Sequence, residues 1–182
     1  MLASLPDVQP LKIHKGKLLL LSPEAAAAVD PLCRDALERA EDGELGADAA
    51  AIVRHLEAAG PSLADEVRME LALEAGAFRA AREKLEREGA IVSRMQVRPG
   101  ETEGHRHAST IARWDRSHPQ RRKAPRAVAL DDLVVIGIRA AVVVQEDEPA
   151  SWFTWPIAHN TIRRLLEARR LVRPAAGWVA AA

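Results

Sequence analysis

Residues 77–114 constrain the fold more than any other part of the chain, because their hydrophobic spacing changes abruptly at Gly89. Before this glycine, Phe78 and Leu85 share one stripe at helical spacing. After it, apolar and polar residues alternate on both sides of the loop 99–106, which predicts two strands. Glycine suits the left-handed residue that ends many helices. The stretch therefore predicts a helix followed by a β-hairpin.

Two further helices are expected before this stretch, at residues 48–59 and 62–73. The first ends at Gly60, and the second begins with the sequence S-L-A-D, which resembles a capping box. Three helices followed by a hairpin are typical of a winged helix. We therefore expect an α+β fold, mainly α, of tandem winged-helix (helix-turn-helix) domains with short β-hairpins.

The last third of the chain repeats this pattern. An apolar helix is expected over residues 130–144, Pro156 is expected to begin the next helix, and residues 171–180 predict a compact hairpin. A second winged helix with a short wing fits this repetition. Its core is expected to contain the aromatic residues Trp152, Phe153 and Trp155.

The front of the chain has a different pattern. Residues 11–21 predict a tight hairpin, and residues 23–41 predict two helical pieces that meet at Asp30, with Cys33 and Leu37 facing inward. The expected segments are an N-terminal hairpin with helices (1–46), a first winged helix (47–118), a basic linker (119–128) and a second winged helix (129–182).

The chain has no net charge, with 26 basic and 26 acidic residues, but its charges are unevenly distributed. Residues 1–77 carry 7 Lys and Arg against 14 Asp and Glu, residues 78–126 carry 13 against 6, and residues 127–182 carry 6 against 6. Affinity for nucleic acid comes largely from Lys and Arg meeting phosphates, so the basic stretch predicts double-stranded DNA as a partner. The alternative is that these cations balance the acidic helices of the same chain.

Basic side chains of the two expected winged helices are the candidate DNA contacts. In the first winged helix, the exposed face of the third helix also carries Glu83 and Glu86. These carboxylates would repel phosphates, so the expected DNA contacts shift toward the hairpin. In the second domain, Asn can pair with adenine and Arg with guanine. The candidates are Arg79, Arg82, Arg87, Arg94, Arg98, Arg106 and Arg113 in the first domain and Asn160, Arg163 and Arg164 in the second.

Other kinds of site have little support in the sequence. Cys33 is the single cysteine, which excludes an internal disulfide and a Cys-x-x-Cys metal site. The pair His105-x-His107 has no Cys or carboxylate cluster at ligand spacing, so neither a metal nor a cofactor is expected. Without a signal peptide or a long apolar run, the chain is expected to be cytoplasmic and to have no membrane partner.

Three stretches of the sequence, taken together, resemble a known family. They are PLKIHKGKLLLLSPEA at residues 10–25, IARWD at 111–115 and the Trp-Pro pair at 155–156. In this combination the chain resembles bacterial DNA glycosylases that unhook interstrand crosslinks and alkylated purines. The resemblance implies tandem winged helices around a concave face that binds DNA, and a link to DNA repair.

The catalytic signature of that family is a Gln-apolar-Gln or Gln-apolar-Asp triplet. Here the only Gln-x-Asp triplet is Gln145-Glu146-Asp147, whose middle residue is charged, so no catalytic residue is assigned. Three functions are left open, in order of preference. They are DNA binding without chemistry, a crosslink-repair-type glycosylase or its remnant, and a protein-interaction module or transcriptional regulator acting with a protein partner or as a homodimer.

Overall fold

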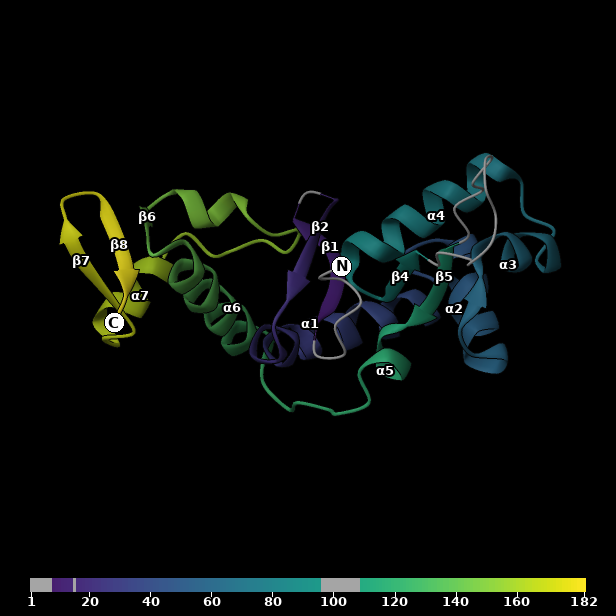
Figure 1. Ribbon diagram of the computed structural model, residues 1–182, viewed down its shortest axis with the longest axis horizontal. Coiled ribbons are helices and arrows are strands. Elements are labelled where there is room, and N and C mark those ends of the chain that lie inside the picture. Colours follow the sequence, from purple (N-terminus) through teal and green to yellow (C-terminus); the bar gives the residue numbers. More distant parts are fainter. Residues whose placement is uncertain (1–7, 15, 96–108) are drawn as a thin grey trace, which may run out of the picture.

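The computed structural model describes residues 8–14, 16–95 and 109–182 of the chain. These residues form seven α-helices, one 3-10 helix and eight strands in small antiparallel sheets (Figure 1). The α+β class is therefore confirmed. The molecule is elongated, with a three-stranded sheet and helices at each end and the N-terminal segment between them (Figure 1).

One end contains six elements in the order helix, strand, helix, helix, strand, strand. They are α2 (Ala47–Ala59), β3 (Ser62–Leu63), α3 (Ala64–Glu70), α4 (Ala75–Glu88), β4 (Ile91–Met95) and β5 (Ser109–Arg113). Strand β5 lies in the middle of the sheet and pairs with β3 and with β4. The expected helix–glycine–hairpin unit is confirmed, because Gly89 follows α4 in the left-handed conformation with φ of 81°.

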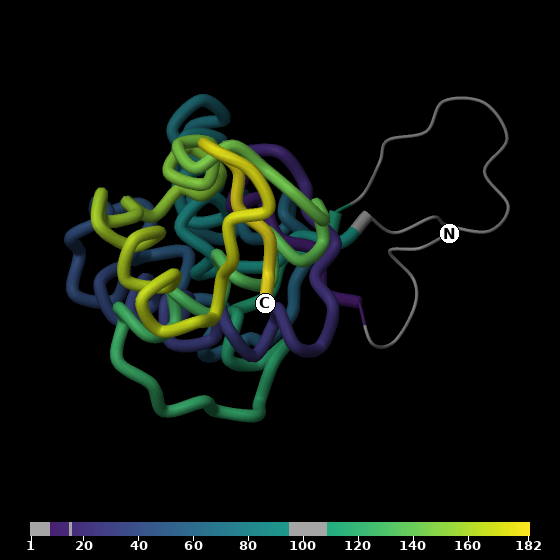
Figure 2. The backbone as a smooth tube through the Cα atoms, turned by 90° about the vertical axis from the view of Figure 1, so that its left-hand side faces the viewer, coloured from purple at the N-terminus to yellow at the C-terminus, as the bar shows by residue number. Residues whose placement is uncertain are grey.

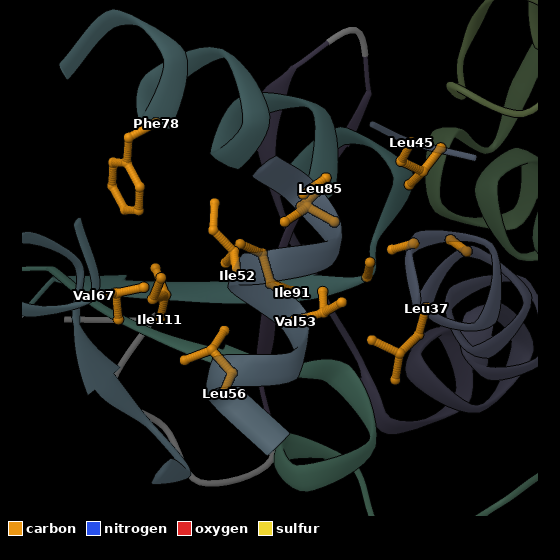
Figure 3. Close-up of a cluster of buried hydrophobic side chains, with 14 of the residues drawn as sticks. Leu37, Leu45, Ile52, Val53, Leu56, Val67, Phe78, Leu85, Ile91 and Ile111 are labelled. Carbon is orange, nitrogen blue, oxygen red and sulfur yellow. The ribbon is translucent and has the colours of Figure 1, made fainter. Parts of the chain in front are cut away.

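The core of this end is a cluster of apolar side chains between the helices and the sheet (Figure 3). Ile52 and Leu56 of α2 contribute to it, together with Phe78 and Leu85 of α4 and Ile111 of β5. Leu85 is fully buried, as its helical stripe predicts. Burial of one such side chain stabilises the fold by about 1.5–3 kcal/mol.

The other end repeats the same order of elements. They are α6 (Arg126–Ala141), β6 (Val143–Gln145), the 3-10 helix η2 (Glu148–Ser151), α7 (Thr161–Glu167), β7 (Leu171–Ala175) and β8 (Trp178–Ala181). Strand β8 lies between β6 and β7, as β5 lies between β3 and β4. The expected C-terminal hairpin is therefore confirmed. The sheets at the two ends have the same strand order.

The N-terminal segment joins the two ends. Strands β1 (Gln9–His14) and β2 (Lys17–Leu21) form the expected hairpin, and α1 (Pro23–Glu41) contacts α2, α4 and α6. A second cluster contains Cys33 of α1, Trp114 at the start of α5 (Trp114–Ser117), Leu133 of α6 and Trp155. Cys33 and Leu37 face inward, as expected. Residues 118–125 connect α5 to α6 along one side of the molecule (Figures 1 and 2).

Two expected helix boundaries near the front are wrong. Residues 62–73 do not form one helix, because Ser62 and Leu63 pair with β5 and α3 ends at Glu70. Residues 23–41 form a single helix with Pro31 inside it. Although a proline removes one helical hydrogen bond, the buried stripe continues on both sides of it, so tertiary packing keeps the helix whole.

Three expectations about the second half are also wrong. The helix expected over residues 130–144 ends early, because α6 stops at Ala141 and residues 143–145 form β6. Pro156 does not begin a helix, since α7 starts at Thr161. Trp155 packs in the cluster around α1 instead of the core of its own end, whereas Trp152 and Phe153 do pack at that end. Within the described residues, we find no helix with the length and apolar character that crossing a membrane would need.

Candidate nucleic-acid interface

The outer face of α4 presents the cations that the helical stripe predicts. Arg79, Lys84 and Arg87 are exposed, because Phe78 and Leu85 turn the opposite face of the helix into the core. Glu83 is exposed beside them. The face therefore carries three cations and one carboxylate.

Glu86 does not lie on that face, which corrects the expectation. Its side chain is 3% exposed and accepts from Lys12 Nζ at 2.5 Å, from Arg82 Nε at 2.9 Å and from the Ser93 hydroxyl. Burial alone would raise the pKa of Glu86, but the hydrogen bonds from Lys12 and Ser93 and the charge of Arg82 lower it below its usual value. Arg82 is thus engaged within the protein.

Arg113 also lies inside an ion-pair network. Only 7% of its side chain is exposed, and it contacts Glu41 of α1 at 2.6 Å, Glu57 of α2 at 3.4 Å and Asp115 at 3.0 Å. The expected contact between Arg113 and a DNA backbone would require breaking these pairs. In this structure Arg113 ties β5 to the two helices.

The other candidates on the first hairpin have different surroundings. Arg94 of β4 is exposed, and its Nη2 donates to Gln9 Oε1 at 3.0 Å. Arg98 and Arg106 lie outside the described residues, as does the pair His105-x-His107. Arg94 is therefore the exposed hairpin candidate that the structure places.

In the second repeat, from α6 to β8, the candidate residues also divide into an exposed side chain and one held by an ion pair. Arg163 is exposed, with Glu167 Oε1 at 3.9 Å from its Nε. Arg164 is held by Asp131 of α6 through two contacts, one of them at 2.8 Å. Asn160 precedes α7 and makes no capping hydrogen bond with its side chain. Arg163 is thus the more accessible arginine of α7.

The basic linker is attached to the protein by carboxylates, a feature that the sequence analysis missed. Asp30 is fully buried and accepts from the Trp114 indole at 2.8 Å, from Arg34 Nε at 2.9 Å and from the backbone N–H of Arg122 at 2.8 Å. The guanidinium of Arg122 pairs with Asp132. Asp30 precedes Pro31, and this pattern predicts the start of a helix. A buried carboxylate with three donors leaves no mark in the local sequence.

The ion pairs explain where part of the charge asymmetry goes. Acidic residues of α1 pair with basic residues from the middle of the chain: Glu41 with Arg113, and Asp35 with Arg126 at 2.8 Å. Such pairs between segments reduce the number of cations available to a partner. Some exposed cations of residues 78–126 form no ion pair within the described residues. They are Arg79, Lys84, Arg87, Arg94, Arg116 and Lys123.

The described residues contain no group of three or more His, Cys, Asp or Glu side chains placed to hold a metal ion. Comparisons with family models, with curated proteins and with solved structures found no match to this chain. The chemistry of the exposed cations therefore carries the functional argument.

Proposed function

We propose that the chain binds double-stranded DNA through two winged-helix units and has no chemistry of its own. The repeated order of elements supports this proposal, because the sheet orders β3-β5-β4 and β6-β8-β7 are the same. In a winged helix the third helix, here α4 or α7, faces the major groove and the hairpin contacts the backbone. Helix-turn-helix proteins in general place their recognition helix in the major groove in this way.

The single observation that carries the proposal is the outer face of α4. Arg79, Lys84 and Arg87 point away from the core with one exposed carboxylate, Glu83, among them. Each Lys or Arg that neutralises a phosphate releases counterions, so binding through this face weakens as salt rises. On α7, Arg163 is the more accessible arginine for contact with a base or a phosphate.

The test measures the affinity of the full chain for a short random duplex at several salt concentrations. The double variant Arg79→Gln/Arg87→Gln is expected to lower the slope of log K against log salt by up to about 1.8, since each phosphate contact contributes about 0.9. The control Arg126→Gln/Arg139→Gln removes two exposed arginines that pair with Asp35 and Glu24. No binding of the wild-type chain at about 50 mM salt would reject the proposal.

A protein-interaction role is the second candidate, because the C-terminal sheet exposes apolar side chains. Val143 of β6 and Val172 of β7 both align with Ala180 of β8, and Trp178 lies next along the same face. Val143, Val172 and Trp178 are 41%, 46% and 40% exposed. Apolar patches of this kind mark protein contacts. A molecular mass in solution above that of one chain, restored to one chain by Trp178→Ser, would support a homodimer through this face.

A further inference from the structure

The three-stranded sheet β3-β5-β4 of the first repeat, from α2 to β5, has a hollow on the face that points away from the core in Figure 3. Ile91 and Ile111 point into the core, so the alternate residues Arg94 of β4 and Thr110 of β5 lie on the other face, directly opposite each other in the ladder. Residues of α5 close this face on one side. The hollow has a volume of about 280 Å³ and is lined by Pro61, Val92, Arg94, Thr110, Ala112, Arg116 and Ser117.

The charged side chains among the described residues that line this Arg94–Arg116 hollow all have one sign. Arg94 and Arg116 are both exposed, and none of the described residues that line the hollow is acidic. Gln9 Oε1 accepts a hydrogen bond from one N–H of Arg94. A guanidinium has five N–H donors, so Arg94 has others with which to bind a ligand. Two arginines on one concave site are suited to an oxyanion, because the fork of a guanidinium matches the oxygens of a phosphate.

A hydroxyl in the wall strengthens this assignment. Thr110 Oγ1 is buried and has no hydrogen-bond partner in the described part of the chain. Buried polar groups are nearly always paired, so an unpaired one calls for an explanation. Thr110 is part of the lining, and rotation of its side chain about χ1 would bring this buried hydroxyl to an oxyanion in the hollow as a donor. Ser117 adds a second hydroxyl to the lining.

The hollow is large enough to hold a phosphate. At about 30 Å³ for each water molecule, its volume corresponds to roughly nine waters. That space accommodates one phosphate with some of its hydration. A backbone phosphate would enter with its neighbouring nucleotides outside.

We propose that the Arg94–Arg116 hollow binds a single phosphate group, held by the two guanidinium groups and the hydroxyls of Thr110 and Ser117. The choice of a DNA phosphodiester as its source rests on the proposed DNA binding. A free phosphate or a phosphate-bearing small molecule has the same chemistry, so the experiment separates these sources.

The first measurement is the thermal midpoint of the full chain with and without inorganic phosphate. A ligand that binds the folded state raises Tm. Phosphate also stabilises proteins by exclusion from their surface, so the relevant quantity is the difference between wild type and variants. Arg94→Gln/Arg116→Gln is expected to lose the specific part of the shift. The control Arg126→Gln/Arg139→Gln, with the same change of charge elsewhere, is expected to keep it.

A third variant separates binding from stability. Thr110→Val has nearly the same shape and lacks the hydroxyl, so it is expected to raise Tm of the free protein, because an unpaired buried hydroxyl is removed. It is also expected to reduce the shift that phosphate produces. A purely structural role for Thr110 would not move these two quantities in opposite directions.

The second measurement is the salt dependence of binding to duplex DNA. Arg94→Gln/Arg116→Gln is expected to lower the slope by about 0.9, the contribution of one phosphate. If Arg94→Gln/Arg116→Gln loses the phosphate-induced Tm shift but keeps the salt slope of DNA binding, a free phosphate-bearing ligand is supported. The same conclusion follows if the variant loses the shift and the wild-type chain does not bind DNA. A lowered slope alone supports the DNA backbone. If wild type binds DNA and the variants change neither the slope nor the phosphate shift, the hollow is not a phosphate site, and the proposed DNA binding stands without it.

Discussion

Single residues in this chain show how burial reverses the role that a side chain has in the sequence. Glu86 follows Leu85 on α4, and helical spacing places it near the exposed face. Lys12 of β1 covers that position and brings a cation to the carboxylate. On the exposed face this carboxylate would repel phosphates, but in the structure it holds α4 against β1 and β4.

The lowered pKa of Glu86 leads to a prediction about pH. A carboxyl whose folded pKa is lowered contributes stability above its unfolded value, about 4.3, and this contribution is lost as the pH falls through the folded value. Glu86→Gln is therefore expected to cost about 1.5–3 kcal/mol at neutral pH, since its hydrogen bonds are charge-assisted. Urea unfolding at neutral and acidic pH measures this cost, which should shrink in acid. The matched control is Glu83→Gln on the exposed face, and equal costs for the two variants would contradict the buried network.

Secondary-structure elements show the opposite behaviour, because several of their boundaries are encoded locally. Helix α4 ends at Gly89, whose φ of 81° is one that residues with a side chain rarely adopt. Tertiary packing adds a second requirement at the same position. A Cβ atom on Gly89 would lie 2.7 Å from Cys33 Sγ, and that cysteine is fully buried in α1.

Gly89→Ala is therefore expected to lose about 2–4 kcal/mol, from the left-handed conformation and from overpacking together. Chemical denaturation measures this loss. Gly76→Ala in the same helix is the control, and it should be neutral or slightly stabilising because no atom of the described residues lies within 4 Å of its Cβ. Adding Cys33→Ala to Gly89→Ala should recover the packing part of the loss. Strict additivity of the two changes would show that the close approach is relieved in some other way.

At the scale of the whole molecule, the two repeats are held together by α1 and by the linker. Asp30 joins α1 to Trp114 and to Arg122, and Asp132 of α6 binds Arg122 from the other side. Asp132 also binds Arg170 at 2.6 Å; burial opposes its ionisation, but these two arginines lower its pKa below the usual value. Any DNA that contacts both repeats would meet them in a set arrangement.

The whole-molecule arrangement also bears on catalysis. Gln145 ends β6 opposite Trp178, and its neighbour Glu146 is bound by Arg173, so the triplet Gln145-Glu146-Asp147 belongs to a strand end held by β7. We expect no base excision. Release of an alkylated purine from duplex DNA should stay at the level of heat-treated protein, with an active glycosylase as the positive control. Release above that level that disappears in Gln145→Ala would overturn this expectation.

Local patterns in the sequence determined much of the fold. The stripe of Phe78 and Leu85 predicts α4 and its buried face, Gly89 predicts its end, and the alternation that follows predicts strands β4 and β5 of one hairpin. These features depend on residues a few positions apart, whose spacing sets which face they share. The exposed Arg79 and Arg87 follow from the same periodicity, so this part of the candidate interface could be predicted.

Only the tertiary structure decided which cations form ion pairs within the described residues. Arg113, Arg122 and Arg164 look like Arg79 and Arg87 in the sequence, but each meets a carboxylate from another element. The Arg94–Arg116 hollow likewise depends on β4, β5 and α5 coming together. A charge can be neutralised by any residue that the fold brings within a few ångströms, and the attraction depends on distance in space. The separation of two residues along the chain does not predict that distance.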